Sequence, residues 1–320
     1  MMLKKTIIIF ILFISCQEDK SERYVLKSNG KINHVTVVSS EDIWNGEVGG
    51  LIREKLSLPY EGLPIDEPIF SLKYLPINSF SGFAKSSRNV LLISKDSTSE
   101  TKFLKNKYAK PQVVAFFADI NEKNLIIKIK NLCDSMISEF NKNEANEKRA
   151  RILKALSKDK TLFKKFNFDL KYPSIYKTVK DTFNFVWIEK KISKGTLNII
   201  SYTLPYENFN KINLERVINI RDSIGRIYIP GRLAKTFMST DRDYMPYFDK
   251  ISFSELNVFS IKGMWEVKND FMGGPFINYI IDDFKNDRVI VLEGFVFAPS
   301  ISKREYMFEL KTILRTLKIY

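Results

Sequence analysis

The chain has 320 residues, enough for one large domain or two smaller ones, and 51 lysines and arginines against 37 acidic residues give it a formal net charge of +14. The chain has one histidine, His34, and two cysteines, which are too few for a zinc site built from several histidine or cysteine ligands. The excess of positive charge comes mostly from lysine, and the chain is also rich in Ile, Asn and Phe. This composition is typical of AT-rich genomes and does not predict nucleic-acid binding. We expect a solvated basic surface, or one that attracts anionic lipid head groups or phosphate-bearing glycans.

The amino terminus reads as an export signal that ends in a cysteine. Lys4 and Lys5 precede an uninterrupted apolar run over residues 7–14, followed by Ser15 and Cys16. This order is that of a cleaved secretory signal, and the cysteine at the cut makes it resemble a bacterial lipoprotein signal, in which Cys16 carries acyl chains such as palmitate. The run is too short for a transmembrane helix, which needs about 20 apolar residues. A plain cleaved signal with an incidental cysteine is the alternative.

We therefore expect a signal peptide over residues 1–15 and a bilayer anchor at Cys16, with loss of Lys4 and Lys5 lowering the charge from +14 to +12. Residues 16–31 are mostly polar and predict a solvated tether. The acidic pair Glu18-Asp19 resembles a signal for transport to the outer surface in Bacteroidota lipoproteins. An outer-membrane protein that faces the periplasm is the alternative.

Residues 32–158 are expected to form an amino-terminal α+β lobe. Its pattern predicts a helix from Ser40 to Leu56, a proline-punctuated connection to Phe70, and strands at residues 32–38, 70–76, 89–94 and 112–118. Apolar residues spaced by three and four predict a helix from Leu125 to Phe140. We expect this helix to break at the polar residues 141–146 and to resume from 145 to 156.

Residues 159–320 are expected to form a second α+β lobe, opening with a loop over 159–172. Strands are predicted at residues 185–189, 197–203, 258–267, 276–281 and 288–297, and a helix at 213–224. Ser302 and Glu305 match a capping box for a final helix from Lys303. The class is α+β with mainly antiparallel sheets and helices packed on one face of each. Two alternatives stay open: an internal duplication that gives two similar lobes, and one continuous domain.

Motifs in the second half carry a resemblance to a family. They are Gly263-Met-Trp-Glu-Val, Asp270-Phe-Met-Gly-Gly-Pro-Phe and Glu293-Gly-Phe-Val-Phe-Ala-Pro, followed by Lys303-Arg304. Together with Trp44-Asn-Gly-Glu-Val-Gly, Leu63-Pro-Ile-Asp-Glu-Pro, Arg88-Asn89, Lys110-Pro-Gln and Arg221-Asp222, they resemble a family of uncharacterised Bacteroidota lipoproteins. The resemblance implies an envelope lipoprotein and supplies no activity, cofactor or catalytic residue.

These motifs supply the candidate binding or structural residues: Arg88, Arg221, Asp222, Trp265, Asp270, Gly273, Gly274, Glu293, Lys303 and Arg304. Glu293 interrupts an apolar run that predicts a buried strand, where a carboxylate costs several kcal/mol unless it is paired. We predict an ion pair with Arg88, Arg221, Lys303 or Arg304, and a functional acid is the alternative.

Glycines and aromatic residues in the same motifs have both structural and functional interpretations. Gly273 and Gly274 are expected to supply positive φ in a hairpin turn, or to let a ligand approach the backbone. Trp187 and Trp265 are expected in the core, with stacking on a glycan as the alternative. Asp241-Arg-Asp243 is interpreted as a solvated loop rather than a carboxylate pair.

Known catalytic signatures are absent from the sequence. No Gly-x-Ser-x-Gly elbow, Walker loop or dinucleotide glycine loop occurs. With Cys16 acylated, Cys133 has no disulfide partner and is expected to fill the core of an apolar helix face. We therefore expect no metal and no cofactor.

Two hypotheses follow. The first is a non-enzymatic envelope lipoprotein that binds an envelope protein or glycan, with a contact face that includes residues 263–276 and 293–304. The second is a glycan hydrolase with Glu293 and Asp270 or Asp282 as acid and base, which needs two carboxyl groups about 5–9.5 Å apart across a cleft.

Overall fold

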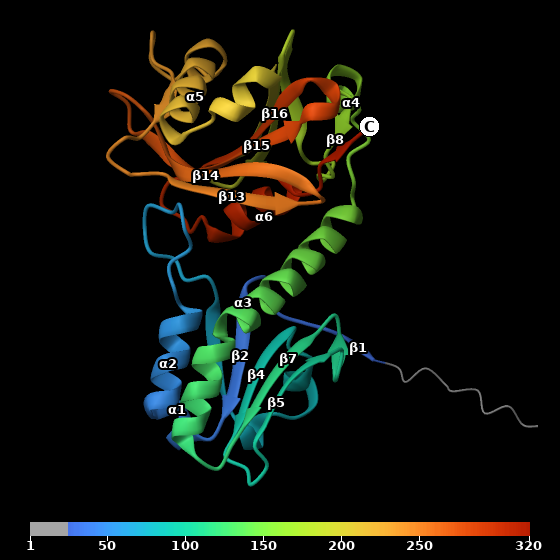
Figure 1. The fold of residues 1–320 in the computed structure, drawn as a ribbon, viewed down its shortest axis with the longest axis vertical. Helices are drawn as coiled ribbons and strands as arrows, with labels where there is room; N and C mark the ends of the chain where they lie inside the picture. Colours follow the sequence, from blue (N-terminus) through green and yellow to red (C-terminus); the bar gives the residue numbers. More distant parts are fainter. Residues whose placement is uncertain (1–24) are drawn as a thin grey trace, which may run out of the picture.

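The computed structural model describes residues 25–320, without the side chains of residues 207–208. The expected signal peptide (1–15), the lipidation site Cys16 and the first part of the tether lie outside the described residues. The described chain forms two lobes, each built around its own sheet, and the long helix α3 runs from the smaller lobe toward the larger one (Figure 1). Within residues 25–320, no helix combines the length and the apolar character needed to cross a bilayer.

The smaller lobe contains a five-stranded sheet in the order β3-β2-β4-β7-β5. Its strands are β2 (His34–Ser39), β3 (Ser71–Pro76), β4 (Asn89–Ser94), β5 (Glu100–Lys105) and β7 (Val113–Ala118). All neighbours pair in parallel except the edge strand β5, which is antiparallel to β7. The central strands are nearly continuous apolar runs because both faces of a parallel sheet are covered.

Three helices cover one face of this sheet: α1 (Glu41–Asn45), α2 (Glu47–Leu56) and α3 (Glu122–Leu153). The single helix predicted before Leu56 is thus two helices, separated at Gly46, which has an extended backbone. The short helices η1 (Ile77–Ser79) and η2 (Gly82–Ser86) flank Phe80, which packs in a smaller apolar cluster. The short strand β1 (Leu26–Lys27) pairs with β6 (Ala109–Lys110), so part of the predicted tether packs against the lobe.

Helix α3 is continuous, and the predicted break at residues 141–146 is wrong. Its buried face continues past Phe140 with polar residues, Asn143, Glu144 and Glu147. These follow the same spacing of three and four residues as the apolar positions before them. The interior of the lobe is polar at this point, which an apolar pattern does not reveal.

The larger lobe contains an eight-stranded sheet whose pairings are all antiparallel, with β13 added beside β14. Its strands are β9 (Lys177–Thr182), β10 (Phe185–Ile192), β11 (Gly195–Pro205), β12 (Met238–Thr240), β13 (Tyr247–Phe253), β14 (Leu256–Val267), β15 (Met272–Asp283) and β16 (Arg288–Phe297). The predicted α+β class is therefore confirmed. The two lobes differ in strand number and pairing, so they do not share one topology.

Helices cover both faces of the large sheet. On one face α6 (Arg304–Leu314) packs with α4 (Thr161–Phe166), which lies within the predicted loop, and the pair β8 (Phe168–Asp169) and β17 (Lys318–Ile319) closes the core. On the other face lie α5 (Leu214–Tyr228), η3 (Tyr206–Lys211) and a second apolar cluster, with η4 (Phe284–Asn286) near the edge. Covered on both faces, β16 is apolar from Val289 to its end except at Glu293.

Candidate functional site

A pocket of about 680 Å³ lies between the two lobes. This volume is within the range of about 300–1,000 Å³ that is usual for small-molecule sites. Its wall is formed by α3 of the small lobe, by α6 and two strands of the large lobe, and by the chain between α2 and β3. Segments that are far apart in the sequence therefore meet here.

The chain between α2 and β3 leaves the small lobe and inserts into the large one. Leu63 is buried in the core of the large lobe, and Tyr60 packs against that core. Gly62 has a φ of +84°, and a Cβ atom at this position would lie 3.0 Å from Cβ of Lys262. Glycine is therefore required where this segment passes over β14. The insertion places residues 58–61 in the pocket wall.

The same segment caps helix α6. Glu67 accepts hydrogen bonds from the backbone amides of Lys303 (2.7 Å) and Arg304 (2.9 Å), and from the hydroxyl of Ser302. The predicted capping box of Ser302 and Glu305 is therefore wrong: the cap is supplied by a residue distant in the sequence. Arg304 also donates to the carbonyl of Pro68 (2.7 Å). The predicted site residues Lys303 and Arg304 thus fasten one lobe to the other.

A second polar junction crosses between α3 and α6. Glu309 accepts from Lys148 of α3 (3.0 Å), from Lys190 of β10 (2.7 Å) and from the hydroxyl of Tyr176 (2.8 Å). Burial raises the pKa of Glu309, but the positive charges of the two lysines lower it by more. The pKa of Glu309 therefore lies below its ordinary value. Both junctions hold α6 against the small lobe, which fixes the shape of the pocket.

Positive side chains dominate the ionisable groups of the pocket. Five cationic residues and two carboxylates line it: Lys142, Arg149, Lys262, Lys311 and Arg315, with Glu61 and Asp134. Lys262 is paired with Glu61 and with Asp249 (3.2 Å). Arg315 donates to the hydroxyl of Tyr279 (3.3 Å). The pocket therefore has a net positive wall on the side of the large lobe.

Lys311 is the exceptional group in this wall. Its side chain is partly buried, and among the described residues its ammonium group has no hydrogen-bond or ion-pair partner. Burial, followed by the charges of Arg315 and Lys262, lowers the pKa of Lys311 to about 8. A nearby negative charge would relieve this penalty.

The pocket wall also has an apolar part, beside the polar side chains of Ser138, Asn141, Asn146 and Thr312. Met307 and Phe308 of α6 and Ile277 of β15 are buried, and Ile137 of α3 is partly buried. These side chains lie beside the cationic wall because α3 and α6 face each other across the pocket. The site can therefore accept a molecule that has both an anionic and an apolar part.

The Glu293 motif forms a buried ion pair with one of the four predicted arginine and lysine partners. Glu293 is fully buried and accepts from Nε and Nη2 of Arg221 at 2.8–3.1 Å. Asn278 donates to its other side at 2.9 Å. The guanidinium lies over the ring of Phe276, 3.9 Å from the centroid. Burial, and then the Glu293 carboxylate, raises the pKa of Tyr202.

Asp222 belongs to the same network through a threonine. Thr240 accepts from Nη1 of Arg221 (3.0 Å), and its hydroxyl donates to Asp222 (2.8 Å). Asp222 also pairs with Arg242 at the surface (3.3 Å). The predicted pair Arg221-Asp222 thus connects α5 to the sheet, and its charges are matched within the lobe.

Gly273 and Gly274 lie inside β15 rather than in a turn, so the predicted positive φ is wrong. The turn uses Asn269, with a φ of 63°. A Cβ atom on Gly274 would lie 2.0 Å from the carbonyl oxygen of Val296, so glycine permits close contact with β16. Trp265 is buried and donates to that same carbonyl (3.2 Å). Its ring is therefore not available to stack on a glycan.

The carboxylates proposed for hydrolysis do not share a site. Asp270 pairs with Arg232 (2.8 Å), and Asp282 accepts from the amide of Phe284 (3.1 Å) at an exposed position. None of Glu293, Asp270 and Asp282 lines the pocket between the lobes. The arrangement on which the hydrolase hypothesis depends is thus not found among the described residues.

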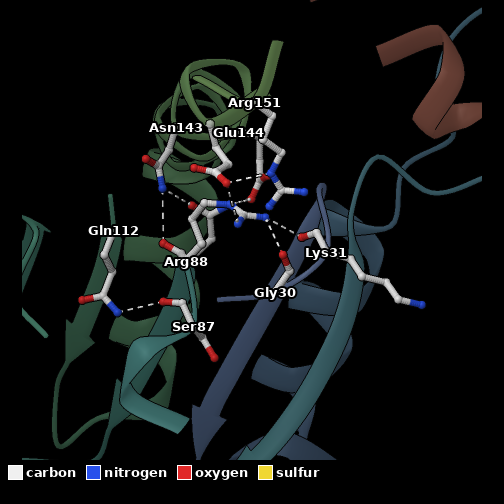
Figure 2. A network of polar contacts seen from close by, with 10 residues as sticks. Gly30, Lys31, Ser87, Arg88, Gln112, Asn143, Glu144 and Arg151 are labelled. Atoms are coloured by element: carbon white, nitrogen blue, oxygen red, sulfur yellow. Dashed lines mark hydrogen bonds and ion pairs between the residues drawn. The ribbon is translucent and has the colours of Figure 1, made fainter. Parts of the chain in front are cut away.

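Arg88, the remaining predicted site residue, lies in the small lobe, in a network of its own (Figure 2). Its Nε donates to Glu144 of α3 (3.0 Å), and its Nη2 donates to the carbonyls of Gly30 (3.1 Å) and Lys31 (2.6 Å). Asn89 also donates to Glu144 (2.6 Å). Burial raises the pKa of Glu144, while Arg88 opposes that shift. The network connects the end of the predicted tether to α3.

Sequence reasoning missed the residues that line the pocket. Lys311, Met307 and Phe308 read as ordinary positions of an amphipathic helix, and nothing near them marks a ligand. One signal was present: Lys262 stands before the motif Gly263-Met-Trp, and it is Lys262 that reaches the pocket.

Family models match almost the whole described chain. The model "Domain of unknown function (DUF4837)" matches residues 155–316, slightly more than half of the chain. The chain belongs to this family. A second model, "Domain of unknown function (DUF8532)", matches residues 28–153. The search of curated proteins found no match.

Among solved structures, the chain is similar to the "Human StarD13 (DLC2) lipid transfer and protein localization domain". The similarity covers 44% of this chain and 88% of that chain, with 11% sequence identity and a TM-score of 0.20. At this score the likeness supports no conclusion about fold or function.

Proposed function

We propose that the chain is a lipid-anchored envelope protein that binds a ligand in the pocket between its lobes and does not catalyse a reaction. The proposal rests on the difference between a charged group that has partners and one that has none. The buried carboxylate of Glu293 is fully paired, whereas the pocket contains the unpaired ammonium group of Lys311. An unpaired, partly buried charge marks a functional site more strongly than a satisfied ion pair does.

The envelope location rests on the sequence. The order Lys4-Lys5, apolar run, Ser15, Cys16 supports cleavage and acylation, and the resemblance to Bacteroidota lipoproteins agrees with it. Acyl chains on one cysteine would anchor the body stably, since each buried methylene contributes about 0.8 kcal/mol. The outer membrane is the proposed location, facing either the surface or the periplasm, with an envelope protein or glycan as a further partner.

Photo-crosslinking in intact cells tests binding at the pocket. We expect Ile137→p-benzoylphenylalanine, with the photoreactive ring in the pocket wall, to give a repeatable adduct on irradiation. The matched control is the same change at Ile127, which lies on the same helix, is 55% exposed and is outside the pocket. Equal labelling at both positions, or none at Ile137, would contradict the proposal.

The anchor is tested separately by cell fractionation. The variant Cys16→Ala is expected to move from the membrane fraction to the soluble fraction, because it cannot be acylated. An unmodified Cys16 in the purified native protein would remove the basis of the envelope proposal.

A further inference from the structure

We infer that the pocket between the lobes binds a phosphate ester with an apolar tail. The phosphate would contact Lys262, Lys311 and Arg315, and the tail would lie against Leu58, Ile69 and Ile137. This inference deepens the proposed function and rests on it, because it names the class of ligand.

The head-group assignment follows from charge and geometry. Three cations line the pocket on the side of the large lobe: Lys262 of β14, Lys311 of α6 and Arg315, which directly follows α6. Lys262 is already paired with two carboxylates, so Lys311 and Arg315 supply the unmatched positive charge. A phosphate monoester carries between one and two negative charges near neutral pH and three acceptor oxygens. It can contact several cations at once, whereas a carboxylate offers fewer acceptors and a single charge.

The tail assignment follows from the apolar wall. Met307 and Phe308 are buried and lie on the same helix as Lys311, whereas Leu58, which is 44% exposed, and the partly buried Ile69 and Ile137 leave apolar surface open in the pocket. Inorganic phosphate would leave this surface in contact with water. An alkyl chain would remove it from water, and the free-energy gain is roughly proportional to the area removed.

The size of the pocket favours a small ligand over a large hydrophilic polymer. The inserted segment forms one part of the pocket wall, and α3 and α6 form the rest together with Lys262 and Ile277. Its volume of about 680 Å³ suits one small amphiphile. Trp187 and Trp265, for which stacking on a glycan was the alternative interpretation, do not line it.

Calorimetry with three probes tests the inference on the mature chain, residues 16–320 with Cys16→Ala, in detergent-free buffer. The probes are inorganic phosphate, dodecyl phosphate below its micellar concentration and uncharged dodecyl maltoside. We expect dodecyl phosphate to bind at least about tenfold more tightly than either of the other two. Equal binding of dodecyl maltoside and dodecyl phosphate would overturn the inference, as would the absence of dodecyl phosphate binding.

Variants separate the two halves of the site. Lys311→Met should weaken both phosphate and dodecyl phosphate by about tenfold or more, and Ile137→Gln should weaken dodecyl phosphate alone. The control for the lysine change is Lys130→Met, at an exposed position of α3 outside the pocket. Unchanged affinities in Lys311→Met, with its thermal midpoint preserved, would overturn the head-group assignment.

An additional experiment with lipid vesicles identifies the source of the phosphate ester. Extraction of a fluorescent phosphatidic acid from vesicles would support a membrane lipid as the ligand. Binding of dodecyl phosphate without such extraction would support a soluble phosphate ester. If the Ile137 adduct forms in cells but dodecyl phosphate does not bind, the ligand class is wrong while the binding function stands.

Discussion

The network around Glu293 and the pocket around Lys311 differ in how their charged side chains are paired. At Glu293 the carboxylate accepts from both Arg221 and Asn278, and the arginine is further satisfied by Thr240. At Lys311 the charges of Arg315 and Lys262, which have its own sign, act more strongly than the opposite charge of Glu61. The motif that stands out in the sequence therefore stabilises the fold, and an unremarkable helix position carries the unmatched charge.

Breaking the Glu293 network tests the first half of this comparison and should have the largest effect. Glu293→Gln leaves the guanidinium of Arg221 buried without its counter-charge, so we expect the free energy of unfolding to fall by about 3–5 kcal/mol. Denaturant titration measures the change. A double variant, Arg221→Met with Glu293→Leu, should recover part of the loss. A single variant as stable as the wild type would show that the pair is not structural.

The junction of Glu309 should be of intermediate importance. Glu309→Gln removes the charge that Lys148 and Lys190 share, so we expect a loss of about 1–3 kcal/mol at pH 7. Because the folded-state pKa of Glu309 lies below the ordinary value of 4.5, its contribution is present above pH 4.5 and is lost as the pH falls through the folded-state pKa. The difference in unfolding free energy between wild type and variant should therefore shrink in acid. A difference that stays constant below pH 4.5 would contradict this assignment.

Removing the unmatched charge should have the smallest effect on stability, and of opposite sign. Lys311→Met is expected to stabilise the protein by about 1–2 kcal/mol at pH 7, because the pKa of about 8 lies below the ordinary 10.5. Between about pH 8 and pH 10.5 the unfolded state binds more protons than the folded state, so the stability of the wild type rises with pH. The stability advantage of the variant therefore disappears over this range. Thermal unfolding at pH 7 and pH 10 measures this. Destabilisation at pH 7 would mean that Lys311 has a partner.

The sequence predicted those features that depend on local pattern. Strands β4 and β16 match their predicted residues, and a carboxylate inside the apolar run of β16 correctly indicated an ion pair. Which cation pairs with Glu293 depends on the position of α5 over the sheet, which no local pattern contains. The break predicted in α3 was wrong for a related reason: Glu144 is polar yet buried, because it pairs with Arg88, the residue before β4.

The pocket could not be predicted from the sequence. Its walls come from the inserted segment before β3, from α3 and from α6, which adjoin only because Glu67 and Glu309 hold the lobes together. Each of these contacts joins residues more than 150 positions apart. Pattern analysis finds core positions and turns, but it does not find a cavity formed by distant segments.

The most direct test of the account is a crystal structure of the mature chain with dodecyl phosphate. We expect phosphate density within hydrogen-bonding distance of Nζ of Lys311, with the alkyl chain lying against Leu58 and Ile137. Ligand density at another surface, with the space between α3 and α6 unoccupied, would contradict it.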